Sequence, residues 1–168
     1  MVSPMSRRLV VFAGLLAAPV ATAVTQTKVP APQSPVKPTD KRLSILQKFF
    51  RDNGCPLGRH AKDFIEAADR NHLDWRLLPS ISMVESGGGK AYRNNNVLGW
   101  VNGEHKFPSV SAGIRTVAER LSYSRLYRHK NVDRILATYN PLPEYARRVK
   151  LMMRNIEMAG LPVESAAN

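Results

Sequence analysis

The residue with the clearest potential for chemistry is Glu85, which ends an apolar helical stretch in SISMVESGGGKAYRNNNVLGW, residues 80–100. Leu78, Ile81 and Glu85 are spaced i, i+3 and i+7, so the carboxyl group emerges on the apolar face, toward the core or a cleft beside it. The negative end of the helix dipole and the loss of water against apolar neighbours both raise a carboxyl pKa. The pattern therefore predicts a glutamate that keeps its proton near neutral pH. The alternative is a glutamate that bends to solvent or pairs with an arginine of the basic final helix.

A protonated carboxyl group is suited to general-acid cleavage of a glycosidic bond, because the leaving oxygen needs a proton as the C–O bond breaks. The residues that follow fit a sugar ligand. The glycines at 87–89 leave the backbone open to a close ligand, and the asparagines at 94–96 offer amides to hydroxyl and acetamido groups. Tyr92 and Trp100 offer flat faces for stacking on sugar rings. Each feature has a structural alternative: the glycines could end the helix, the asparagines could form a turn, and Trp100 could be a core side chain.

Three motifs in order, MVESGGG, NNNVLGW and the later TYNP, resemble the lysozyme-like superfamily of peptidoglycan-cleaving enzymes. The chain is most similar to bacterial glucosaminidase-type members, and more distantly to soluble lytic transglycosylases and goose-type lysozymes. The resemblance covers about residues 60–158. It implies a mainly α, lysozyme-like compact helical domain with one small β-hairpin. The activity it implies is that of a glycosidase that cuts the peptidoglycan glycan strand.

The resemblance also implies roles for individual residues. The catalytic acid of the family falls on Glu85. The resemblance implies substrate-binding positions at Ser86, Asn95, Asn96 and Tyr139. The flat rings of Tyr92 and Trp100 add two more predicted substrate-binding residues. Leu98 stands where many relatives place an aromatic residue, which is a departure from the family pattern.

The second catalytic group stays open. Glu104 follows the Asn102-Gly103 turn and is the first candidate for a base or a stabilising carboxylate, with simple solvation as its alternative. Asp133 and Glu144 lie at helix starts, where carboxylates commonly act as dipole partners. The acetamido group or the 6-hydroxyl of the substrate could replace a second carboxylate, as the resemblance to transglycosylases implies. A hydrolase and a lytic transglycosylase are therefore both expected possibilities.

The elements that must position these residues follow from apolar periodicity. Helical spacing predicts six helices, near residues 43–50, 61–68, 75–86, 110–121, 132–139 and 145–159. Asp74 is the predicted N-cap of the third helix, and Pro79 is expected to bend its first turns. Between the third and fourth helices, NVLGWVNGEHKF places Asn102-Gly103 between two short runs that could pair as a β-hairpin.

The N-terminal segment predicts export. A basic start, an apolar run of twelve residues and Ala21-Thr22-Ala23 predict a signal peptide over residues 1–23, with an uncleaved anchor as the alternative. Residues 24–40 contain four prolines and read as a linker. The catalytic domain is expected over residues 41–163, secreted or periplasmic, without stable membrane insertion after signal cleavage.

Charge and composition limit the classes of binding partner that we expect. The net charge of +12 falls by two when the signal peptide is removed, and it favours anionic wall polymers beside the peptidoglycan glycan strands. No nucleic acid is expected, since neither export nor any recognition motif fits one. We expect a monomer with no cofactor and no metal, with Cys55 as a buried apolar residue. The competing class is a non-catalytic basic module that binds cell-wall glycan with the same fold.

Overall fold

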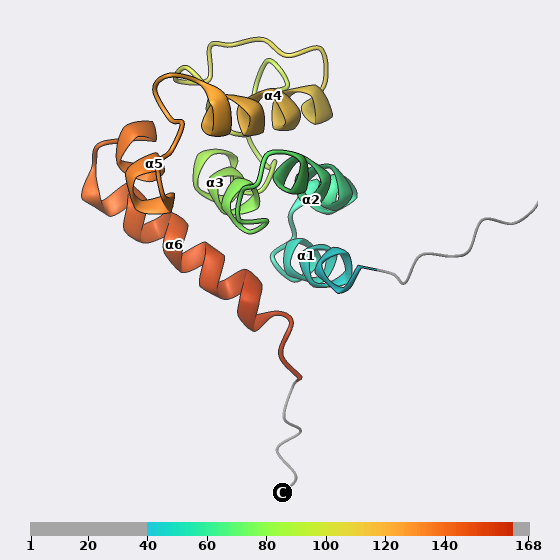
Figure 1. The fold of residues 1–168 in the computed structure, drawn as a ribbon. Helices are drawn as coiled ribbons and strands as arrows, with labels where there is room; N and C mark the ends of the chain where they lie inside the picture. Colours follow the sequence, from blue (N-terminus) through green and yellow to red (C-terminus); the bar gives the residue numbers. More distant parts are fainter. Residues whose placement is uncertain (1–39, 163–168) are drawn as a thin grey trace, which may run out of the picture. The chain divides into compact units, whose positions relative to one another are not determined.

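A computed structural model describes residues 40–162 of the chain, and these residues form a mainly helical domain (Figure 1). The predicted signal peptide, the linker except its last residue, and the end of the predicted domain lie outside the described residues. The elements in order are α1 (Lys41–Asp52), the 3-10 helix η1 (Pro56–His60), α2 (Ala61–Arg70), α3 (Leu77–Ser86), α4 (Val110–Tyr123), α5 (Val132–Tyr139) and α6 (Pro143–Met158). None of these helices has the length and apolar character needed to cross a bilayer.

The six predicted α-helices are confirmed, and their ends follow from local side chains. Ser109 caps α4, because its hydroxyl accepts a hydrogen bond from Ala112 N at 3.1 Å. Asn131 caps α5 in the same way through Arg134 N at 3.0 Å. The 3-10 helix η1 was not predicted, since its five residues, which begin with Pro56, are too few to show a helical period.

Helix α3 lies in the middle of the domain, with other helices around it (Figure 1). Its residues Leu77, Leu78 and Ile81 are fully buried. Helix α6 packs more extensively on α3 than any other element does. The helix that ends in Glu85 is therefore the core helix that its apolar pattern predicts.

The start of α3 differs from the prediction. The helix begins at Leu77, and Asp74 instead closes a preceding turn: its carboxylate accepts from Arg76 N and its carbonyl from Leu77 N, both at 2.9 Å. Pro79 therefore lies in the first turn, where a missing backbone N–H breaks no intrahelical bond. Pro79 at this position gives no reason for the bend that the sequence predicted.

The predicted β-hairpin is wrong for the described chain, which contains no strand (Figure 1). Residues 94–107, here called the turn segment, form a series of turns instead. Val101, Asn102 and Gly103 have φ angles of 52°, 53° and 79°, and Gly99 has 68°. Strand residues need strongly negative φ, so these positions leave no extended run long enough for a ladder. The Asn102-Gly103 pair does turn the chain, as the sequence predicted, but the flanking residues are not strands.

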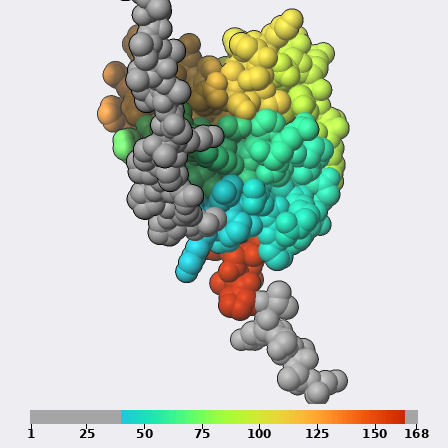
Figure 2. Space-filling model, turned by 90° about the vertical axis from the view of Figure 1, so that its right-hand side faces the viewer, coloured from blue at the N-terminus to red at the C-terminus, as the bar shows by residue number. Residues whose placement is uncertain are grey.

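The turn segment lies against α4. In Figure 2 its atoms run from yellow-green into yellow along the upper right edge of the molecule, next to the golden-yellow start of α4. Gly113 makes this packing possible, because a Cβ there would lie 2.9 Å from Phe107 Cδ2 and 3.1 Å from Asn95 O. Helix α4 thus supports one side of the segment that follows Glu85.

Candidate active site

Glu85 opens into a cleft of about 630 Å³, here called the Glu85 cleft. The cleft lies between the last turn of α3, the turn segment, α4 and the connections on both sides of α5. Its polar lining consists of Glu85, Asn102, His105, Thr116, Arg120, Ser124 and Asn140. The carboxyl group is exposed to solvent through the cleft, as expected of a side chain at the border between core and cleft.

Four aromatic rings form a cluster beside the carboxyl group. Trp100 lies with its ring centroid 6.0 Å from that of Tyr127 and 5.7 Å from that of Tyr139. Tyr139 stacks on Tyr145 at 6.0 Å with an interplanar angle of 8°. Trp100, Tyr127 and Tyr139 line the Glu85 cleft, so the cleft offers ring faces of the kind that sugar rings contact.

The environment raises the pKa of Glu85 above its usual value. Desolvation is the main cause, although one side of the group is open to water. The Tyr145 hydroxyl and the charge of Arg148 lower the pKa and offset part of that effect. The direction agrees with the sequence prediction. Glu85 also lacks an ion pair, a property shared among the described carboxylates only with Glu119.

Tyr145 is an unusual neighbour for an acid. Its hydroxyl is buried and makes no well-formed hydrogen bond to any described residue, yet it lies close enough to Glu85 to lower the carboxyl pKa. Burial and the nearby carboxylate raise the pKa of the phenol far above its usual range. The phenol therefore stays protonated and is available as a donor to Glu85 when the carboxylate is charged.

Gly99 lets the turn segment approach Glu85 closely. A Cβ at this position would lie 2.6 Å from Glu85 Cδ and would overlap Oε2, and the φ angle of 68° favours glycine as well. The Tyr139 hydroxyl donates a hydrogen bond to Leu98 O at 2.5 Å, and this bond fixes the backbone just before Gly99. Tyr139 thus lines the cleft and also holds the part of the turn segment that lies against Glu85.

Ser86 ties the end of α3 to the turn segment. Its buried hydroxyl lies 2.9 Å from both Ser82 O and Val97 O, and it accepts a hydrogen bond from Gly89 N at 3.1 Å. The hydroxyl proton is directed at backbone carbonyls, and these contacts position Glu85 and Val97 relative to each other. Ser86 is buried and does not line the Glu85 cleft, so the structure gives it a positioning role.

The glycines after Ser86 face away from the Glu85 cleft, against the sequence interpretation. Gly87 ends α3 with a φ angle of 60°, the left-handed cap that glycine favours. A Cβ on Gly88 would lie 2.5 Å from Cys55 Sγ, and one on Gly89 would lie 2.7 Å from Leu57 Cγ. These glycines therefore allow close packing on η1 and its start, where Cys55 is buried as predicted.

The asparagines hold the turn segment together. The Asn95 amide donates to Phe107 O at 2.9 Å. The buried Asn96 amide donates to Trp100 O at 2.8 Å and to His105 O at 3.1 Å, and it accepts from Trp100 N at 2.9 Å. Neither asparagine lines the Glu85 cleft. Their amides replace the backbone pairs that a hairpin would have made.

Two further predicted residues lie outside the cleft lining. Tyr92 is exposed, 41% by accessible area, before the turn segment. Glu104 forms an exposed ion pair with Arg93, and neither residue contributes to the cleft wall. The structure therefore brings together Glu85, Trp100 and Tyr139 among the predicted site residues, and it leaves Tyr92 and Glu104 apart from them.

Several cleft residues had no signal in the sequence. Arg120 comes from the last turn of α4, Tyr127 from the turn after it, and His105 from the turn segment. Their spacing from Glu85 in the chain follows no period, so only the fold brings them together. Among the described residues, no group of three or more histidine, cysteine or acidic side chains could hold a metal ion.

No family model, curated protein or solved structure matches the chain. The resemblance of its three motifs to the lysozyme-like superfamily therefore remains a prediction from the sequence. The mainly helical fold and the cleft at Glu85 are what the structure adds to it.

Proposed function

We propose that the protein is an exported enzyme that cleaves the glycan strand of peptidoglycan, with Glu85 as the general acid. The observation that carries the proposal is the Glu85 carboxyl group itself. It has a raised pKa, no ion pair and an open, aromatic-walled cleft beside it. Structural carboxylates on a basic surface are normally paired, as ten of the described ones are here.

Glu85 transfers its proton to the glycosidic oxygen as the bond from that oxygen to C1 breaks. The Tyr145 hydroxyl can then donate to the new carboxylate, and Arg148 stabilises its charge. Trp100 and Tyr139 orient the sugar rings through their faces. The Ser86 hydroxyl and the Tyr139 hydroxyl keep the acid and the adjoining turn segment in place.

Two routes complete the reaction, and they differ in products. In hydrolysis, water attacks C1 and passes a proton to a base, and the product has a reducing end. In the transglycosylase route, the 6-hydroxyl of the same sugar attacks C1 and returns its proton to Glu85, which leaves a 1,6-anhydro end. Among the described residues, Glu85 is the carboxylate of the cleft, and His105 is the lining group suited to take a proton from water.

The test compares wild type, Glu85→Gln and Glu119→Gln on purified cell walls. Release of sugar fragments is expected to fall about 100-fold or more in Glu85→Gln, because general-acid catalysis contributes that much. Glu119→Gln is the matched control, since Glu119 is the other described carboxylate without an ion pair and does not line the cleft. A wild type that binds walls but releases no fragments would identify a glycan-binding module instead.

Mass spectrometry of the fragments then separates the two routes. Reducing ends indicate hydrolysis, and 1,6-anhydro ends indicate transglycosylation. His105→Ala sharpens the result, because loss of the base should slow hydrolysis and leave the intramolecular route unaffected. The paired measurement therefore assigns both the product and the residue that completes the reaction.

A further inference from the structure

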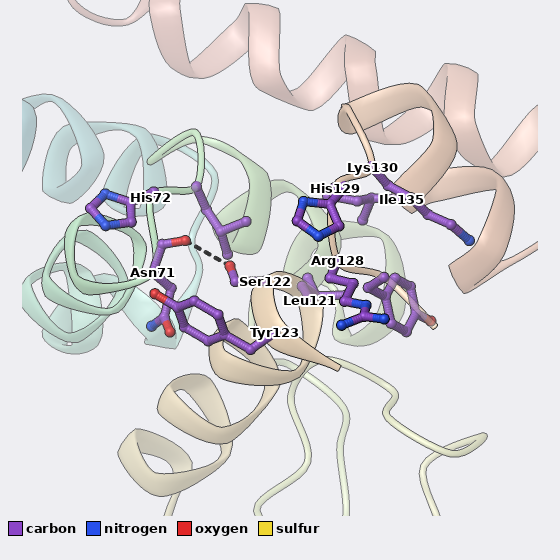
Figure 3. A pocket seen from close by; sticks show the side chains of 11 residues that line it. Asn71, His72, Leu121, Ser122, Tyr123, Arg128, His129, Lys130 and Ile135 are labelled. Atoms are coloured by element: carbon purple, nitrogen blue, oxygen red, sulfur yellow. Dashed lines mark hydrogen bonds between the residues drawn. The ribbon is translucent and has the colours of Figure 1, made fainter. Parts of the chain in front are cut away.

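A second hollow of about 460 Å³, here called the basic pocket, lies beside the Glu85 cleft. It is formed by the turn after α2, the last residues of α4 and the connection to α5. In Figure 3, His72 and His129 lie on opposite sides, with Ser122 and Leu121 between them. The Ser122 hydroxyl donates to Asn71 O at 2.7 Å and joins the two sides of the pocket.

Both histidines adopt a backbone conformation that disfavours their side chains. His72 has a φ angle of 54° and His129 one of 64°, in the left-handed region where glycine carries no penalty. Neither imidazole makes a hydrogen bond or ion pair with another described residue. Outside the turn segment, His72 and His129 are the described non-glycine residues with this conformation, which glycine would adopt without penalty. The backbone alone therefore gives no reason for a histidine at either position.

The charge of the pocket selects an anionic ligand. Arg128 lines the pocket and has no carboxylate partner among residues 40–162, while the lining itself contains no acidic residue. Lys130 is used elsewhere, since its ammonium group donates to Thr138 Oγ1 at 2.6 Å. Arg128 and the two imidazoles are therefore the donors that a carboxylate entering the pocket would meet.

The pocket and the Glu85 cleft share Tyr127, which contributes to both walls. A ligand in the pocket can therefore be part of the molecule that occupies the cleft. The peptide stems of peptidoglycan are acidic and are covalently attached to its glycan strand. Their carboxylates complement the basic charge of the pocket, and their attachment to the strand places them beside the Glu85 cleft.

We propose that the basic pocket binds the carboxylates of a peptide stem while the glycan strand lies in the Glu85 cleft. This proposal rests on the proposed function for its choice of ligand. The wall phosphate polymers carry suitable charge too, but they have no fixed position relative to the bond being cut. His72, His129 and Arg128 are specificity residues under this proposal, and they take no part in the chemistry at C1.

The first experiment measures binding without catalysis, so that it stays informative if the glycosidase proposal fails. Histidine ring signals of the full chain are followed by NMR while a synthetic acidic stem peptide is added. The signals of His72 and His129, assigned with His72→Gly and His129→Gly, are expected to shift saturably, and a fully amidated peptide is expected to have no effect. Equal shifts with the amidated peptide would overturn the proposal, as would stronger shifts with inorganic phosphate, which would make the pocket a phosphate site.

The second experiment measures preference during cleavage. Wild type is expected to have kcat/KM about tenfold higher on strands that carry stems than on strands stripped by an amidase, the size expected of one charge-assisted contact. Arg128→Ala should lower this ratio toward one. Arg59→Ala is the control, since Arg59 is exposed, lies on η1 and lines neither hollow. An unchanged ratio in Arg128→Ala would contradict the proposal.

The glycine variants give a readout that separates function from folding. His72→Gly and His129→Gly relieve the left-handed backbone, so the Tm of each variant should equal or exceed that of wild type. Their affinity for the acidic stem peptide should fall at the same time. Retained affinity in both variants would show that the imidazoles do not contact the ligand.

Discussion

Glu85 and Glu104 are the two glutamates that the sequence offers first as catalytic groups, and their partners and surroundings in the structure differ. Glu85 has no ion pair, faces an aromatic-walled cleft and has a raised pKa. Glu104 is exposed, pairs with Arg93 and lies outside the cleft lining. Partial desolvation beside the cleft favours the protonated form of Glu85, whereas Glu104 is held in an ion pair on the open surface. The difference separates a candidate acid from a surface residue.

Among variants that keep Glu85, the largest change should come from displacing its carboxyl group. In Gly99→Ala the new Cβ would overlap the carboxylate, so we expect cell-wall cleavage to fall about 100-fold, the effect of a displacement of about 1 Å. The free energy of unfolding should fall by about 1–2 kcal/mol, because the φ angle of 68° is unfavourable for alanine. Both quantities can be measured on one preparation, by fragment release and urea unfolding.

Gly103→Ala is the matched control. Its φ angle of 79° carries the same backbone penalty, but a Cβ there meets nothing within 4 Å. The variant should therefore lose similar stability and keep its activity. Equal losses of activity in the two variants would mean that the contact of Gly99 with Glu85 is not important.

The pH profile tests the raised pKa of Glu85 next. A general acid works when protonated, so activity should fall as pH rises through the pKa of Glu85. Tyr145→Phe removes a neighbour that lowers this pKa, and it should move the alkaline limb to higher pH. The same variant should be about 1 kcal/mol more stable, because the buried hydroxyl lacks a well-formed hydrogen bond. A limb that stays in place would show that Tyr145 does not act on Glu85.

How much of this contrast the sequence predicts depends on the range of the interactions. The position of Glu85 on the apolar face of a core helix follows from local spacing, and the structure places it as expected. The environment of Glu104 depends on Arg93 and on the path of the turn segment, which left-handed residues and asparagine amides determine. From the sequence alone, those amides could equally be groups that bind sugar or groups that hold a turn. Gly99, Tyr127 and Tyr145 contribute to the surroundings of Glu85 through tertiary contacts, and the spacing of residues in the sequence does not predict such contacts.

Stability as a function of pH gives a smaller effect with a definite sign. The pKa of Glu85 is higher in the folded chain than in the unfolded one, so its protonated form favours folding. That contribution is fully present below the unfolded pKa and is lost as pH rises through the folded pKa. Glu85→Gln should therefore be more stable than wild type at neutral pH, and the difference should vanish in acid. Thermal unfolding at several pH values checks this, and a wild type that is more stable at neutral pH would contradict it.

The smallest effects should come from the other glutamate. The Arg93–Glu104 pair is exposed on both sides, and pairs of this kind contribute about 0–1 kcal/mol because water and salt screen them. Arg93→Ala, Glu104→Gln and the double variant form a cycle whose coupling energy should fall in that range and shrink as salt is added. Cleavage of cell walls should stay within about twofold of wild type in all three, since rim charges have little effect on a distant reaction centre. A Glu104→Gln variant that lost activity as Glu85→Gln does would remove the contrast between the two glutamates. It would make Glu104 a second catalytic carboxylate that reaches the cleft only when substrate is bound.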